Sequence, residues 1–146
     1  MDKNIISKHL YNDNEHQSIK YVKSINDEET LYVYTYNYNW DDGLVIPKEI
    51  MSSTVCTLSI ALLLFHRAEG ISYLEDKTSL NEADDDIKSF INTLYHNILD
   101  GKYPIGNVAF DPKLSKVQLY KINRIISTAE KVFITPIDGV DLDIYL

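Results

Sequence analysis

The stretch TLYVYTYNYNW, Thr30 to Trp40, decides the fold class, because its own pattern and its flanking residues point to different secondary structures. Leucine, valine, threonine and asparagine alternate here with four tyrosines and a tryptophan. A period of two among aromatic and β-branched residues is typical of a strand. If this pattern prevails, the fold is α+β, with residues 30–40 as a strand.

The residues just before this stretch have the pattern of a helix start instead. In the sequence NDEE, Asn26 is a candidate N-cap and Glu29 would complete a capping box. Asp27 and Glu28 would lie at the positive end of the helix dipole, which stabilises carboxylates. The residues by themselves therefore leave both a strand and a helix open for this segment.

Other parts of the chain carry clearer helical signals. The longest apolar run is VCTLSIALLLF, Val55 to Phe65, which at eleven residues is about half of what a bilayer span needs. We expect a buried helix here, capped by Ser53 or Thr54. Pro47 is expected at the first position of the preceding helix, where its missing N–H has no cost.

The most regular pattern lies between residues 79 and 101. Apolar residues recur at steps of three and four, which predicts an amphipathic helix; they are Ile87, Phe90, Ile91, Leu94 and Ile98. Either a Ser79–Glu82 capping box or Asp84 would start this helix, and Gly101 stands where it should end. Ser115 and Gln118 form a second capping-box pair before another apolar stripe.

The tail predicts extended structure. Residues 132–134 and 142–144 are typical of short strands, and Pro136 and Gly139 bracket a turn, so a small hairpin is expected. The predicted fold is therefore mainly α, a single-domain bundle of about five to seven helices with a short C-terminal hairpin. Residues 1–24 would form an N-terminal helical extension, 25–125 the helical core and 126–146 a C-terminal extended segment.

The composition restricts the classes of partner. The chain has 22 Asp and Glu against 14 Lys and Arg, a net charge of −8. This balance disfavours nucleic acid and anionic membranes and suits a basic protein partner. Cys56 is the sole cysteine, and no apolar signal core follows Met1. We therefore expect a cytoplasmic protein without an internal disulfide.

No motif predicts a cofactor or a metal site. The four histidines lack the spacing of helical metal ligands, and the five glycines form no phosphate-binding loop. Acidic residues instead mark candidate sites for a protein partner, both before the regular helix and in the tail, where two of them would share one face of a strand. The candidate partner-binding residues are Asp84, Asp85, Asp86, Asp141, Asp143 and Tyr145.

The sequence WDDG, Trp40 to Gly43, allows a catalytic and an architectural interpretation. A carboxylate desolvated by Trp40 could perform acid–base chemistry, with Asp41, Asp42 and His66 as the residues of a small enzyme. We favour a helix exit, in which Trp40 anchors the core and Asp41 and Asp42 cap the helix end. Gly43 would then take a positive φ, before Pro47 starts the next helix.

A family resemblance includes this motif. The elements YNWDDG, IP..I, Cys56, AL..F and A.G..YL, together with LSKVQLYKI at residues 114–122, resemble the bacterial domain of unknown function 4274. The likeness covers roughly residues 25–125. It implies a mainly helical fold with the tryptophan-bearing stretch on a helix, which favours a helix from Asn26 to Trp40. It implies no established activity and no catalytic residues.

The function we infer from the sequence is binding of a protein. An acidic domain rich in tyrosine and without a catalytic constellation is typical of an immunity protein. Such a protein neutralises a contact-dependent or polymorphic bacterial toxin by binding it directly. Tyrosine and tryptophan would supply the residues that dominate the binding energy. The alternatives are a regulatory or scaffold module, and the small enzyme described above.

Overall fold

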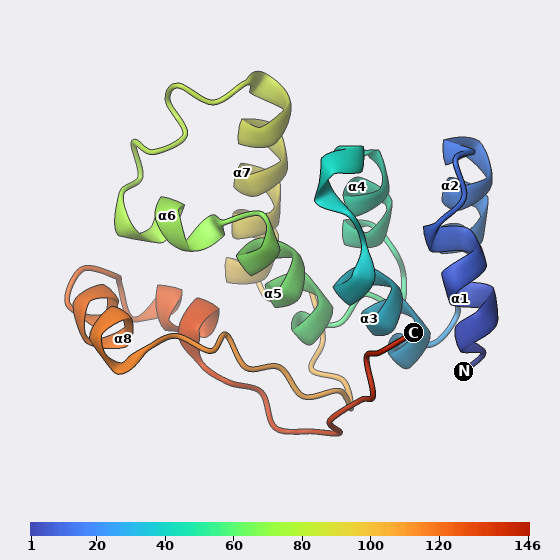
Figure 1. The fold of residues 1–146 in the computed structure, drawn as a ribbon. Coiled ribbons are helices and arrows are strands. Elements are labelled where there is room, and N and C mark those ends of the chain that lie inside the picture. Colours follow the sequence, from blue (N-terminus) through green and yellow to red (C-terminus); the bar gives the residue numbers. More distant parts are fainter.

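Eight α-helices and two 3-10 helices form the regular structure of the chain, which the computed structural model describes from residue 1 to residue 146 (Figure 1). In chain order they are α1 (Lys3–Leu10), α2 (Glu15–Ser24), α3 (Glu28–Asn37), η1 (Trp40–Asp42), α4 (Val45–Met51), α5 (Leu58–Arg67), α6 (Gly70–Glu75), α7 (Asp85–Leu99), α8 (Lys116–Asn123) and η2 (Ala129–Ile134). The mainly helical, single-domain prediction is confirmed. The count exceeds the five to seven expected, because short helices such as α6 lack a periodic signal.

Residues 30–37 of the decisive stretch belong to helix α3, and the alternative of a strand at residues 30–40 is wrong. The predicted helix does not reach Trp40, because α3 ends at Asn37 and Trp40 begins the separate 3-10 helix η1. Five consecutive residues of α3, Leu31 to Thr35, are buried, because α1, α4 and α5 pack around this helix. On a helix, residues two apart point to opposite sides and residues four apart share a side. The alternating tyrosines therefore divide between two sides of α3, and Tyr32 and Tyr36 stack with ring centroids 6.5 Å apart.

The start of α3 lies one residue later than predicted. Asp27, and not Asn26, is the N-cap, and its carboxylate accepts a hydrogen bond from the Thr30 backbone N–H at 2.9 Å. Glu29 forms no capping box and is exposed. Inside the helix, the Thr35 hydroxyl donates to the Leu31 carbonyl at 2.7 Å, which satisfies a polar group in a fully buried position.

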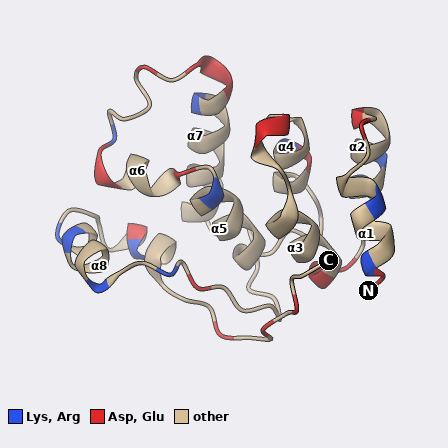
Figure 2. Ribbon diagram, viewed as in Figure 1, with Lys and Arg blue, Asp and Glu red and all other residues tan.

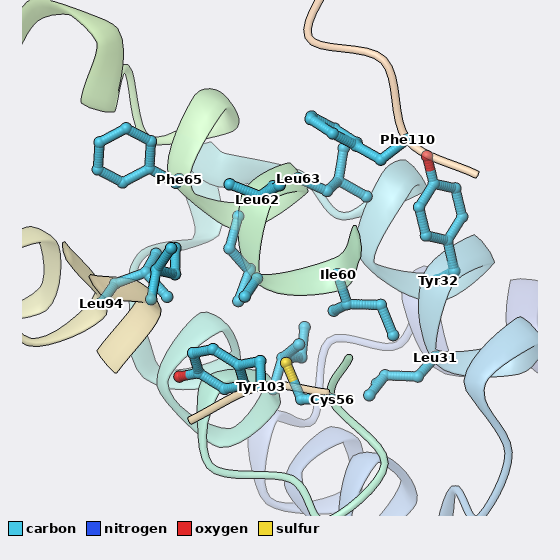
Figure 3. Packing of buried hydrophobic residues seen from close by; sticks show 14 of the residues in the cluster. Leu31, Tyr32, Cys56, Ile60, Leu62, Leu63, Phe65, Leu94, Tyr103 and Phe110 are labelled. Carbon is cyan, nitrogen blue, oxygen red and sulfur yellow. The ribbon is translucent and has the colours of Figure 1, made fainter. Parts of the chain in front are cut away.

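Helix α5 lies at the centre of one continuous core. It contacts α3, α4, α6 and α7, and α2 packs in turn against α4 (Figure 1). The core contains 29 buried apolar residues, and Figure 3 shows the side chains of α5 between α3 and α7. Ile6 and Val22 belong to the same cluster, so residues 1–24 pack on the remaining helices. None of the helices combines the length and apolar character needed to cross a membrane.

Helix boundaries follow the local signals in part. Asp84 caps α7, which excludes the Ser79–Glu82 pair as its cap, and Gly101 follows the helix with a φ of 71°. The capping box of Ser115 and Gln118 is present as predicted.

Two other helix starts were predicted wrongly. Helix α4 begins at Val45, which places Pro47 in its first turn but not at its first position. Helix α5 follows Thr57, so neither Ser53 nor Thr54 caps it. The Thr57 side chain does not cap the helix either, because its hydroxyl donates to Glu28 at 2.5 Å.

The predicted C-terminal hairpin is absent. Residues 129–134 form η2, and the tail pairs with the segment after α7 through isolated bridges, Phe110 with Ile137 and Val108 with Val140. Gly139 lies so close to this segment that a Cβ atom there would stand 2.5 Å from the Asn107 carbonyl oxygen. The glycine therefore serves a close backbone contact with a distant segment and not a local turn.

Candidate functional site

Seven exposed carboxylates gather along one edge of the molecule, which Figure 2 shows across the upper ends of α7, α4 and α2. They come from three separate segments: the α1–α2 connection with the first residue of α2, η1, and the start of α7. We call this surface the acidic edge; it consists of Asp13, Glu15, Asp41, Asp42, Asp84, Asp85 and Asp86. Three of these residues were predicted as partner-binding, and the fold places them beside the WDDG motif.

Contacts between η1, α4 and α7 hold the acidic edge together. Lys48 of α4 forms an ion pair with Asp86, and the Trp40 ring packs edge-on against Phe90 with centroids 6.2 Å apart. Asp84 accepts hydrogen bonds from two backbone N–H groups of the first turn of α7. Lys48 provides the single ion pair within the edge. The remaining carboxylates therefore create a negative potential over this surface.

The WDDG motif differs from its predicted architecture. Asp41 and Asp42 are exposed and cap nothing; Asn39 is the cap, and its side-chain oxygen accepts from the Asp41 N–H at 3.1 Å. Trp40 is only partly buried, although its indole Nε1 is enclosed and has no hydrogen-bond partner. Gly43 has a φ of 94°, as predicted, and ends the turn. The carboxylates thus face solvent and belong to the acidic edge.

A hollow of about 230 Å³ lies directly beside Asp42. Asp13 and Glu15 also line it, and Tyr34 and Tyr38 of α3 form its wall. Burial, together with the charges of Asp42 and Glu15, raises the pKa of Tyr38 to about 12. These carboxylates from separate segments thus act electrostatically on the same side chain.

The predicted site residues of the tail lie elsewhere, in the segment that ends at the C-terminus beside α1 and α3 (Figure 1). Asp143 forms an ion pair with Lys3 at 2.8 Å, and the hydrogen bond from Lys3 lowers the pKa of Asp143. The Tyr145 side chain is 80% exposed, and Asp141 lines a different cavity. Asp141 and Asp143 do not share a strand face, because the tail forms no strand.

A cavity of about 500 Å³ lies between α3, α5 and the two irregular segments on either side of α8 and η2. Tyr32 and Tyr36 line it from α3, and Leu63, His66 and Arg67 line it from α5. The segments 109–113 and 136–144 close the other side. We call this space the strap cavity, because the paired segments cross it as a strap.

His66 has a defined tautomer within the strap cavity. Its Nε2 donates to the Phe133 carbonyl at 2.7 Å, which leaves Nδ1 as the acceptor of the neutral ring. Burial lowers the pKa of His66, and the hydrogen bond to Phe133 only partly opposes this shift. The ring is therefore neutral at physiological pH, with a free lone pair on Nδ1.

The three residues of the enzyme hypothesis do not form one site. His66 lines the strap cavity beside Tyr32 and Tyr36, whereas Asp42 lines the hollow formed by the other two tyrosines, on the opposite side of α3. Asp41 lies next to Asp42 at the surface. No group of three His, Cys, Asp or Glu side chains converges closely enough to hold a metal ion.

Sequence reasoning missed two contributions to these sites. Asp13 and Glu15 belong to a stretch that signals only a break between helices, and their place in the acidic edge depends on how α2 packs against α4. Arg67 marks the point where α5 emerges into water, and its guanidinium lies 4.4 Å from the centroid of the Tyr36 ring. No local signal predicts this contact, because it joins two helices.

Comparison with known proteins gives one family. The family profile described as Domain of unknown function (DUF4274) matches residues 26–99, from the segment before α3 to the end of α7. The match includes Trp40 to Gly43 and the start of α7, so much of the acidic edge lies within it. Residues 114–122, which also resembled the family, fall outside the matched segment. No curated protein sequence and no solved structure matches the chain.

Proposed function

We propose that this chain, which belongs to the family described as Domain of unknown function (DUF4274), is an immunity protein that neutralises a bacterial toxin by binding it. The observation that supports this proposal is the acidic edge, with seven exposed carboxylates and a single ion pair. A basic toxin domain is the partner whose charge complements this surface. In this proposal the chain acts in the cytoplasm, where such toxins reach their targets.

The acidic edge also has the apolar groups that binding surfaces need. Tyr11 is 75% exposed at the end of α1, and Val45 is 42% exposed at the start of α4. Trp40 lies between them in sequence and is partly buried beside the same carboxylates. Aromatic residues dominate the binding energy of many interfaces, while the surrounding charges mainly accelerate association. The edge combines both kinds of group.

The direct experiment uses a basic toxin domain encoded next to this gene. The toxin is expressed in cells with and without this chain, growth is measured, and complex formation is followed with purified proteins. We expect restored growth and a stable complex whose association rate falls steeply as salt is added. Trp40 is the sole tryptophan, so its fluorescence reports binding at the acidic edge.

A triple variant locates the binding surface. Asp41→Asn, Asp42→Asn and Asp85→Asn remove three charges from side chains that make no hydrogen bond or ion pair in the structure. Association at low salt should slow by about tenfold or more, because electrostatic attraction mainly sets the encounter rate. The free energy of unfolding should change little, since all three side chains are exposed.

The matched control removes the same charge from other surfaces. Its three exposed residues are changed as Glu29→Gln, Glu75→Gln and Asp100→Asn. This variant should associate with the toxin nearly as fast as the wild type. Equal slowing by both triple variants would place the binding surface elsewhere, and absence of both complex and protection would refute the proposal.

A further inference from the structure

A tyrosine without a hydrogen-bond partner in the chain lines the strap cavity. Tyr32 is 8% exposed and lines the cavity, and its hydroxyl makes no hydrogen bond within the chain. Figure 3 shows this hydroxyl pointing from α3 toward Phe110, another cavity-lining residue. A hydroxyl can both donate and accept a hydrogen bond, so this group at the cavity wall can pair with a bound molecule.

The helical wall of the strap cavity provides a second and a third binding group. Arg67 lies over the Tyr36 ring and forms no ion pair, so its guanidinium is held in place while its N–H donors remain free. A guanidinium positioned in this way suits a carboxylate, which accepts two parallel hydrogen bonds. The His66 Nδ1, described above, adds an acceptor on the same wall.

The opposite wall has mainly the other charge. Asp111, Asp138 and Asp141 line the cavity from the two irregular segments, and none of them forms an ion pair. Lys113 is the one cation on that side. A purely anionic ligand would be repelled by these carboxylates, and a purely cationic one by Arg67. A molecule with both charges satisfies both walls.

We propose that the strap cavity binds a small zwitterion of the free amino acid type. Its carboxylate lies against Arg67 and the Tyr32 hydroxyl, and its ammonium group faces the carboxylates of the strap. The volume of about 500 Å³ is within the usual range for small-molecule sites. The proposal does not rest on the immunity function, because the cavity and the acidic edge have no residue in common.

The experiment is a binding screen on the intact chain. Each standard L-amino acid is added separately at millimolar concentration, and the melting temperature and the heat of binding are measured. We expect one or a few of them to raise the melting temperature by several degrees. The N-acetyl and the carboxamide derivatives of the same amino acid should each bind at least tenfold more weakly, because each lacks one charge.

Variants assign the contacts. Tyr32→Phe and Arg67→Met should each weaken binding of that amino acid by about tenfold or more, with the folded chain retained. Lys121→Met, which removes an exposed cation from α8, is the matched control and should bind like the wild type.

Three results would overturn the proposal. They are no binding of any amino acid at millimolar concentration, equal binding of the blocked derivatives, and unchanged binding by the Tyr32 and Arg67 variants. Binding that is lost equally in the Lys121 control would show an effect of overall charge and not of this cavity.

Discussion

The carboxylate of Glu28 occupies the space that a side chain at Gly106 would fill. From the first turn of α3, this carboxylate accepts hydrogen bonds from the backbone N–H groups of Asn107 and Val108 at 2.7 and 3.2 Å, and from the Thr57 hydroxyl. One side chain therefore connects the start of α3, the start of α5 and the segment that leads into the strap.

Glu28→Gln should destabilise the chain. An amide has a single acceptor oxygen and cannot accept all three hydrogen bonds, and it lacks the charge that strengthens them. We expect a loss of about 1–3 kcal/mol in the free energy of unfolding, measured by urea denaturation. Glu29→Gln, a change of the same type in the exposed neighbour, is the control and should change stability little. Equal effects of both changes would contradict the role given to Glu28.

Gly106→Ala should depend on residue 28. The new Cβ would collide with the Glu28 carboxylate, so the substitution should cost about 1–2 kcal/mol in the wild type. In a Glu28→Ala background the space is free, and the same substitution should cost much less. A double-mutant cycle measures this coupling directly. Additive effects would show that the two residues do not compete for the same space.

Glu130 should make stability depend on pH in the acidic range. Burial by itself would raise the pKa of Glu130, but hydrogen bonds from Lys77, Ser127 and Tyr95 outweigh this effect and lower the pKa to about 2. The folded pKa lies below the unfolded value, so this stabilisation is complete above pH 4.5 and is lost as the pH falls toward 2.

The variant Glu130→Gln tests this prediction. At neutral pH it should be less stable than the wild type by about 2–3 kcal/mol, and the difference should shrink as the pH is lowered. Urea denaturation at several pH values gives both quantities. Glu75→Gln is the exposed control. A difference that stays constant down to acidic pH would mean that the Glu130 charge does not contribute to stability.

Cys56 should be unreactive in the folded chain. The residue is 3% exposed, and burial raises the pKa of its thiol to about 12, against a smaller opposing effect of Lys102. The thiolate is the reactive form, so a disulfide reagent should label native protein very slowly and unfolded protein at once. The rate of labelling with and without urea checks this, and fast labelling without urea would contradict the packing around α5.

Gly139→Ala should loosen the strap. Its Cβ would stand 2.5 Å from a backbone oxygen, which cannot rotate away as a side chain can. We expect a loss of about 1–3 kcal/mol and faster amide hydrogen exchange at Val140 and Ala109, whose N–H groups take part in the pairing. Asp138→Ala, at the exposed neighbouring position, is the control. Unchanged exchange would show that the strap does not depend on this contact.

Local signals predicted those features that depend on residues within one or two turns. Asp84 and Ser115 cap their helices through N–H groups two or three residues away, and Gly101 follows the last turn of α7. These interactions are the same in any surroundings, so spacing and residue type are enough to predict them. At Asn26 the neighbouring Asp27, with similar chemistry, takes the capping role, whereas no side chain caps α5 because the Thr57 hydroxyl is bound to the distant Glu28.

By itself, the sequence determined that the chain is mainly helical, where α8 begins, where α7 ends, and which family the chain belongs to. The residue pattern left a strand and a helix open at residues 30–40, and only the family resemblance favoured a helix. The tertiary structure decided for a helix at residues 28–37, because the neighbouring helices bury α3 on several sides and so cover the tyrosines on both of its faces. It also decided that the tail forms a strap, and that carboxylates from three segments form one edge. Each of these outcomes depends on contacts between residues far apart in the chain, and spacing along the sequence carries no information about such contacts.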